Sequence, residues 1–262
     1  MNDTQNLFQN NNSENLSEEL LVKTLKKHNY ELKESIGKGR YGKFYKVFHE
    51  LENKFCEVKV VKFNEETEQG LKIKNFTLKE SSILWNLKHP NIIKLYEIII
   101  DIKGALLLII ELAENGVLIS YLDEKLSEEN AFAIFYQIFS GVKNMHEAKI
   151  IHRDLKLENI LVDAKFNLKI CDFGLSKDYV EESNEENKTQ EYTIIRPNII
   201  KEKLTNASFV GSPFYLSPEI ISGGDCFLDS VDIWSLGIIF YSLIFNEYPF
   251  EIKVIVINKL RK

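Results

Sequence analysis

The sequence predicts an α+β fold with two lobes. Its first third, from about residue 30 to residue 111, has the pattern of β-strands, whereas helical periodicity dominates from residue 116 onward. The composition, 44% hydrophobic and 27% charged, is that of an ordinary globular protein and excludes collagen, a coiled coil or wholesale disorder. With 262 residues the chain can bury most of its apolar surface without disulfide bonds.

The N-terminal segment, residues 1–29, is expected to be a disordered tail followed by a short helix. Residues 2–15 are rich in Asn and Gln and show no periodicity. Ser17 and the two acids after it are typical of a helix N-terminus. Apolar and small residues then form a short amphipathic stripe at Leu20, Leu21, Thr24 and Leu25. We expect this helix to be an appendage of the domain that follows.

Runs of β-branched and aromatic residues, broken by Gly or polar turns, predict the strands of the first lobe. These runs are residues 32–36, 44–48, 55–63, 92–100 and 105–110. The last two should form a hairpin, and a helical stretch over residues 71–87 separates them from the first three. In the second lobe the pattern predicts helices over residues 128–146 and 230–245, with short strands near residues 160–170.

Charge and cysteine usage exclude several classes of protein. A net charge of −6 gives no basic surface for nucleic acid or membranes. The three cysteines are far apart and match no metal-binding spacing, which favours a reducing compartment. The longest uncharged apolar stretch, residues 233–245, is shorter than the roughly 20 residues of a membrane span. We expect a cytoplasmic protein with no membrane span and no nucleic-acid partner.

Residues 37–42 have the pattern G-x-G-x-x-G, in which the missing side chains let the backbone approach phosphates closely. A strand precedes this loop and another strand follows it. A dinucleotide-binding fold needs a helix there, so that type of oxidoreductase is excluded. A phosphate-binding loop and an incidental Gly turn both remain possible from the loop alone.

Lys59 lies inside an apolar strand, and Glu80 follows about 20 residues later in the helical stretch. A buried lysine needs a carboxylate partner, which Glu80 could supply. The alternative for Lys59 is an ordinary lysine that faces solvent.

The most specific pattern lies in the second half of the chain. Residues 152–159 read His-Arg-Asp-Leu-Lys-Leu-Glu-Asn, and Asp172-Phe173-Gly174 follows 18 residues after Asp154. The Asp154 carboxylate can accept a proton from a hydroxyl group. Asn159 and Asp172 offer oxygen ligands of the kind that Mg²⁺ prefers. Each triplet is common alone, but the complete ordered set is not.

Taken in order, these motifs resemble those of eukaryotic protein kinases of the Ser/Thr type. Ser217-Pro218-Glu219 stands in place of A-P-E. The resemblance implies a bilobal kinase-like domain over residues 30–250, with an N-lobe over residues 30–114 and a C-lobe over residues 115–250. Residues 251–262 would form a short tail. The calcium/calmodulin-dependent-like group is a possible subgroup.

The resemblance also implies ATP and Mg²⁺ as cofactors. Lys59 would pair with the α- and β-phosphates and with Glu80, while Asn159 and Asp172 would hold Mg²⁺. Asp154 would orient the substrate hydroxyl and accept its proton, and Lys156 would contact the γ-phosphate. The other nucleotide contacts implied by the resemblance are Ile36, Gly37, Lys38, Gly39, Gly42, Phe44, Glu111, Ala113 and Leu161.

Arg153 would bind a phosphate on the activation segment, as an arginine cluster does. Ser208 is the predicted position of that phosphate and Thr205 is the second choice, which implies an upstream activating kinase. Residues 178–207 form a long acidic insertion in this segment. It is either a solvated disordered loop or an acidic pseudo-substrate or docking segment.

The sequence departs from the family pattern at several positions. Glu57 stands where kinases usually place the Ala that lies against adenine, and Phe44 replaces the usual Val after the Gly loop. A carboxylate beside an apolar base is costly without a partner. Val117 replaces an acid that contacts ribose, and Glu158 remains as a candidate for reading a basic residue of the substrate.

Only 12 residues follow Phe250, where the family normally adds further helices, so we expect a C-lobe without its last helices. The function implied by the resemblance is ATP-dependent phosphoryl transfer to Ser/Thr hydroxyls of protein substrates. The alternative is a pseudokinase-like module that binds nucleotide weakly or serves as a scaffold.

Overall fold

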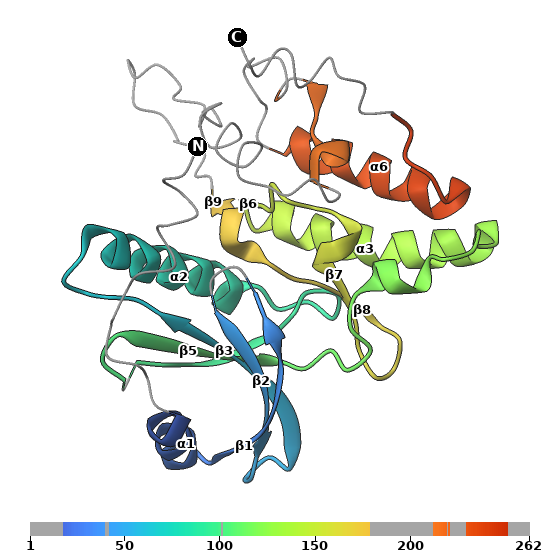
Figure 1. The fold of residues 1–262 in the computed structure, drawn as a ribbon. Helices are drawn as coiled ribbons and strands as arrows, with labels where there is room; N and C mark the ends of the chain where they lie inside the picture. The colour runs from blue at the N-terminus through green and yellow to red at the C-terminus, as the bar shows by residue number, and fades with distance from the viewer. Residues whose placement is uncertain are drawn as a thin grey trace, which may run out of the picture. The chain divides into compact units, whose positions relative to one another are not determined.

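The computed structural model describes residues 18–39, 42–100, 102–178, 212–218, 220 and 229–250. The chain divides into two compact units. Unit 1 comprises Met1–Lys88 and Ile93–Ala113, and unit 2 comprises His89–Ile92 and Glu114–Lys262. Unit 1 contains a five-stranded sheet, whereas most of the secondary structure of unit 2 is helical (Figure 1). The predicted α+β class is confirmed.

The sheet of unit 1 is antiparallel throughout, in the order β1-β2-β3-β5-β4. All five predicted strand runs are present, and the last two pair as the predicted hairpin. The fourth run is shorter than predicted: its strand spans only Leu95–Ile99, and Ile92 belongs to unit 2, where it bridges to Ile170. The strands are β1 (Tyr30–Lys38), β2 (Lys43–His49), β3 (Lys54–Lys62), β4 (Leu95–Ile99) and β5 (Ala105–Glu111).

Two helices cover opposite faces of this sheet (Figure 1). Helix α1 (Glu18–Lys27) packs on the face that carries Cys56, Val58 and Val60 of β3. Helix α2 (Glu68–Asn86) lies on the face that carries Lys59. Successive side chains of a strand point to opposite faces, so β3 places Cys56, Val58 and Val60 under α1 and Glu57, Lys59 and the buried Val61 on the other side.

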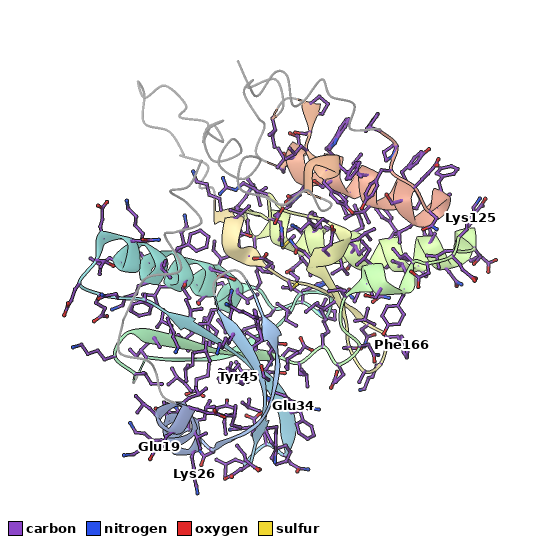
Figure 2. The ribbon with its side chains drawn as sticks, viewed as in Figure 1. Glu19, Lys26, Glu34, Tyr45, Lys125 and Phe166 are labelled. Atoms are coloured by element: carbon purple, nitrogen blue, oxygen red, sulfur yellow. The ribbon has the colours of Figure 1, made fainter. Side chains whose placement is uncertain are left out.

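Helix α1 is part of the core of unit 1, contrary to the expectation that it would be an appendage. Leu21 is 3% exposed and Leu25 is fully buried. The charged residues Glu19 and Lys26 lie on the side of the helix away from the sheet (Figure 2). His28, just after the helix, lies 2.7 Å from the Glu97 carboxylate on β4. The amphipathic stripe identified the buried side of the helix but not the surface that it covers.

Unit 2 contains two long helices, α3 (Glu128–Glu147) and α6 (Ser230–Phe245), which pack through rings such as Phe135 and Phe240 at 4.4 Å. Two antiparallel strand pairs, β6–β9 and β7–β8, lie beside them. Their bounds are β6 (Ile150–Ile151), β7 (Ile160–Val162), β8 (Leu168–Ile170) and β9 (Lys177–Asp178). None of the helices in the described ranges combines the length and apolar character of a transmembrane span.

Candidate active site

The glycine-rich segment of unit 1 is the turn between β1 and β2. The Gly39 N–H donates to the Gly42 carbonyl at 2.9 Å, which closes the turn. A Cβ at Gly39 would lie 2.6 Å from the Phe44 ring, and one at Gly42 would collide with the Val60 backbone. Gly42 therefore needs glycine for space, whereas a side chain at position 39 would have to displace the Phe44 ring. The backbone here is accessible enough to approach a phosphate closely.

Lys59 and Glu80 form the predicted ion pair. The Lys59 ammonium lies 2.9 Å and 3.1 Å from the two Glu80 carboxylate oxygens. The two side chains are 14% and 10% exposed. Phe44 stands directly opposite Lys59 in the β2–β3 register, so its side chain lies on the same face of the sheet. The pair is thus a largely buried cation held by a carboxylate from α2.

The remaining predicted nucleotide contacts of unit 1 lie at the ends of strands. Ile36, Gly37 and Lys38 are the last residues of β1, and Ile36 is half exposed. Glu111 ends β5, where its N–H donates to the Lys94 carbonyl at 2.8 Å.

Ala113, two residues after Glu111, is the last residue of unit 1. The predicted residue Leu161 belongs to unit 2 instead, where it lies on β7 and bridges to Val117.

Asp154, Lys156 and Asn159 meet in the loop between β6 and β7. The Lys156 ammonium lies 3.1 Å from Asp154 Oδ2. The Asn159 amide nitrogen donates to the Asp154 carbonyl at 2.7 Å and approaches Oδ2 at 3.4 Å. Lys156 therefore holds the Asp154 carboxylate, while Asn159 mainly holds the backbone of Asp154. These are the three residues that the sequence predicted as catalytic.

Asp172 comes directly after Cys171, a residue whose backbone is hydrogen-bonded to the same loop. The Cys171 N–H donates to the Asn159 carbonyl at 2.9 Å, which fixes the start of the Asp172-Phe173-Gly174 turn beside Asn159. Asp172 itself adopts a left-handed conformation with φ 62° and is exposed. Its carboxylate accepts from the Gly174 N–H at 3.4 Å.

The donor set of this loop suits a magnesium ion that also binds phosphate. The Asn159 amide nitrogen is used by Asp154, which turns the amide oxygen of Asn159 toward other ligands. Asp172 adds an exposed carboxylate. Within the described ranges, no group of three or more His, Cys, Asp or Glu could hold a metal ion. Mg²⁺ commonly takes one or two protein oxygens and completes its shell with phosphate and water, so these residues fit it.

His152 forms hydrogen bonds with both the Asp154 loop and the segment that leads into Asp172. Its Nε2 lies 3.0 Å from the Cys171 carbonyl, which can only accept, so Nε2 carries a hydrogen. Its Nδ1 lies 3.3 Å from the Asp154 N–H, which donates to it. The ring also packs edge-on against Phe173 with centroids 5.1 Å apart. The neutral Nε2–H form of His152 satisfies both bonds.

The buried carboxylate of Asp232 on α6 holds the backbone at the start of the loop that contains Asp154. Asp232 is fully buried and accepts from the backbone N–H groups of His152 at 2.8 Å and Arg153 at 2.9 Å. His146, at the end of α3, places its Nε2 2.9 Å from the same carboxylate. Sequence reasoning did not identify His146. The residue is separated from Asp232 by 86 positions and belongs to no motif, so no local pattern marks it.

Arg153 is held inside unit 2. It adopts a left-handed conformation with φ 65°, and its Nε donates to the Leu175 carbonyl at 2.5 Å. Burial lowers the pKa of its guanidinium, and the nearby Asp232 carboxylate opposes this effect. The predicted phosphorylation sites Ser208 and Thr205 and the acidic insertion from residue 179 onward lie outside the described residues.

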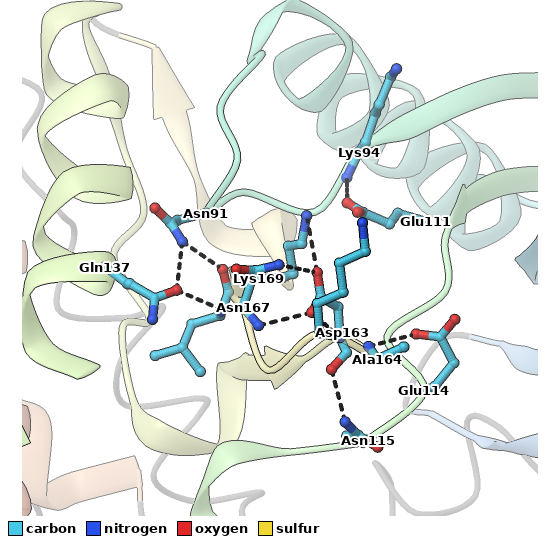
Figure 3. A network of polar contacts seen from close by, with 12 residues as sticks. Asn91, Lys94, Glu111, Glu114, Asn115, Gln137, Asp163, Ala164, Asn167 and Lys169 are labelled. Atoms are coloured by element: carbon cyan, nitrogen blue, oxygen red, sulfur yellow. Dashed lines mark hydrogen bonds and ion pairs between the residues drawn. The ribbon is translucent and has the colours of Figure 1, made fainter. Parts of the chain in front are cut away.

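A polar network holds the β7–β8 hairpin (Figure 3). Asn159 directly precedes β7, and Asp172 follows two residues after β8. The Asn91 amide nitrogen donates to the Gln137 side chain and to the Leu168 carbonyl, both at 3.0 Å. The Asp163 carboxylate accepts from the backbone of the turn and lies 3.9 Å from the Lys169 ammonium. Because the hairpin is tied to α3 and to its own turn, the two oxygen donors next to its ends keep a fixed support.

Comparison with known proteins places these motifs in a family. Residues 30–262 match the protein kinase domain. The chain is 36% identical over 227 residues to NUAK family SNF1-like kinase 1 of Mus musculus, a match covering 86% of this chain and 31% of that protein. It is 36% identical over 228 residues to NUAK family SNF1-like kinase 2 of Homo sapiens, covering 86% and 32%. The chain spans about a third of the length of these relatives.

Proposed function

The chain belongs to the protein kinase family, and we propose that it transfers the γ-phosphoryl group of ATP to Ser or Thr hydroxyls of protein substrates. The observation that carries the proposal is the arrangement around Asp154, whose carboxylate lies 3.1 Å from the Lys156 ammonium and 3.4 Å from the Asn159 amide nitrogen, in a loop bonded to the start of the Asp172 turn. A positioned carboxylate is the group that such a reaction needs to orient a hydroxyl and accept its proton.

The other residues bind and orient the nucleotide in this proposal. Lys59, held by Glu80, binds the α- and β-phosphates, and the backbone of the glycine turn lies over them. Lys156 lies 3.1 Å from Asp154, so it can contact the transferred phosphoryl group beside that carboxylate. Asn159 and Asp172 would hold Mg²⁺, which supplies neutralisation of phosphate charge when bound.

We also propose that Glu158 recognises a basic residue of the substrate. Its Oε2 is buried and has no hydrogen-bond partner among the described residues. A buried carboxylate oxygen without a partner is costly, and a lysine or arginine side chain would satisfy it. Glu158 lies in the same loop as Asp154, four residues on.

Regulation and location are further parts of the proposal. Arg153 would exchange its bond to Leu175 for a phosphate on the activation segment, delivered by an upstream kinase to Ser208 or Thr205. We place the protein in the cytoplasm because its cysteines fit no disulfide framework.

A second candidate function, a scaffold that binds nucleotide weakly, is favoured by two side chains of unit 1. The Phe44 ring packs against Gly39, where it takes up space beside the glycine turn. Glu57 places a partly buried carboxylate two residues from Lys59. Either side chain would lower nucleotide affinity without removing a ligand for phosphate or metal.

The test is transfer of labelled phosphate from Mg-ATP to a pool of Ser-, Thr- and Tyr-containing peptides. The wild-type chain should label Ser and Thr peptides, and Asp172→Asn should abolish the label. Asp123→Asn makes the same change of charge at an exposed position of unit 2 and should leave labelling unchanged. Absence of labelling by a folded wild-type chain that still binds nucleotide would instead support the scaffold.

A further inference from the structure

Glu57 and Lys59 share one face of β3. They are two residues apart on a strand, which places their side chains on the same side at a spacing of about 7 Å. The opposite face of β3 is occupied by the core beneath α1. Lys59 is therefore the nearest cation to Glu57 along its own strand.

The neighbouring elements offer Glu57 little compensation. Directly across from it stand Lys46 on β2 and the apolar Ile110 on β5. The Lys46 ammonium is used elsewhere, since it lies 3.8 Å from the Glu34 carboxylate of β1 and 4.6 Å from the centre of the Phe55 ring. Within the described part of unit 1, no residue forms a hydrogen bond or ion pair with the Glu57 carboxylate.

Lys59 is already neutralised by another group. Both oxygens of the Glu80 carboxylate lie within 3.1 Å of its ammonium. An ionised Glu57 would therefore be a second carboxylate that shares Lys59 with Glu80, at a partly buried position. Burial raises the pKa of Glu57 to about 7, and the positive charge of Lys59 opposes this rise. Near neutral pH the carboxyl group is present in both protonation states.

A nucleotide whose phosphates bind Lys59 brings further negative charge to this face. Like charges disfavour each other's ionised forms, so the phosphates favour the protonated form of Glu57. Binding that favours protonation takes up protons, and protonation strengthens binding by the same factor. The coupling follows from the shared lysine and needs no change of shape.

We propose that Glu57 is a proton-dependent determinant of nucleotide binding: the chain binds nucleotide with the Glu57 carboxyl uncharged, and each binding event above neutral pH takes up one proton at this residue. The inference rests on the proposed nucleotide-binding role of Lys59. Affinity is then constant at acid pH, where Glu57 is already protonated. It falls as pH rises above 7, by up to about tenfold per pH unit.

The test is calorimetric titration with Mg-ADP between pH 6 and pH 9, in pairs of buffers with different ionisation enthalpies. The heat difference between buffers reports the number of protons taken up. Wild type should take up nearly one proton near pH 8. Glu57→Gln, which keeps the size of the side chain, should take up fewer protons and bind more tightly than wild type at pH 8. The phosphates of the nucleotide titrate equally in both experiments and cancel in the comparison.

Glu31→Gln is the matched control, because it removes one carboxylate from the same sheet at an exposed position paired with Phe48. It should behave as wild type. Equal proton uptake by wild type and Glu57→Gln, with measurable binding, would overturn this inference and leave nucleotide binding intact. Failure of all three folded chains to bind Mg-ADP at any pH would overturn the proposed nucleotide binding, and this inference with it.

Discussion

Replacement of Asp232 by asparagine tests how the catalytic loop is held. The carboxylate is fully buried and accepts from three donors: the backbone N–H groups of His152 and Arg153 and Nε2 of His146. Asparagine has the same shape but keeps only one acceptor oxygen. Asp232→Asn therefore leaves at least one of these buried donors facing an NH₂ group.

The expected loss of stability follows from the most favourable orientation of the asparagine amide at position 232. If its oxygen replaces Oδ2, the bonds from His152 and His146 remain and the Arg153 N–H is lost. One unsatisfied buried donor costs about 1–3 kcal/mol, and each remaining bond loses about 1 kcal/mol because its acceptor is no longer charged. We expect a loss of about 3–5 kcal/mol in the free energy of unfolding of unit 2.

Urea unfolding measures that loss, and hydrogen exchange at the His152 and Arg153 amides locates it. Asp229→Asn is the control, because Asp229 is exposed at the start of the same helix and its side chain makes no capping bond. It should change stability by less than about 0.5 kcal/mol. If Asp232→Asn stayed within about 1 kcal/mol of wild type and both amides kept their protection, Asp232 would not be the support of the catalytic loop.

Three further predictions concern unit 1. Leu25→Ala should lower stability in urea unfolding by about 2–5 kcal/mol, and Val22→Ala on the exposed side of α1 by far less; equal effects would contradict the place of α1 in the core. Lys59→Met should destabilise the fold by about 3 kcal/mol and abolish binding of Mg-ADP, because Glu80 is left buried without its cation; a variant that binds normally would be evidence against the phosphate role. Since the pKa of Glu57 rises from 4.5 to about 7 on folding, wild type should lose up to about 3 kcal/mol of stability as pH rises from 4.5 to 7, and Glu57→Gln should lack that part of the pH profile; identical profiles would count against the burial of this group.

Much of the fold was predictable because its elements carry local periodicity. The strand runs alternate apolar and polar residues or are rich in β-branched residues. Helix α3 begins after a Ser cap, and α6 is a long apolar stretch that ends before Asn246. The sequence did not reveal that α1 covers the sheet. An amphipathic stripe marks which side of a helix is apolar, but not which of several apolar surfaces it will meet.

The residues of the candidate site divide in the same way. Asp154, Asn159 and Asp172 stand at fixed spacings within one ordered motif set, so the sequence predicted them together. The Lys59–Glu80 pair was only one of two interpretations until the structure placed both oxygens of Glu80 beside the ammonium. Supports such as His146 depend on contacts between distant segments, which spacing along the chain does not encode.

Single-turnover phosphate transfer measures whether Asp154 acts on the hydroxyl of a protein substrate. Wild type and Asp154→Asn should be compared with Mg-ATP and a Ser-containing peptide, with nucleotide affinity measured in parallel. We expect Asp154→Asn to lower the rate by roughly 10²–10⁴-fold at unchanged nucleotide affinity. A variant that transfers phosphate at the wild-type rate, or that loses transfer only because it no longer binds nucleotide, would contradict this role of Asp154.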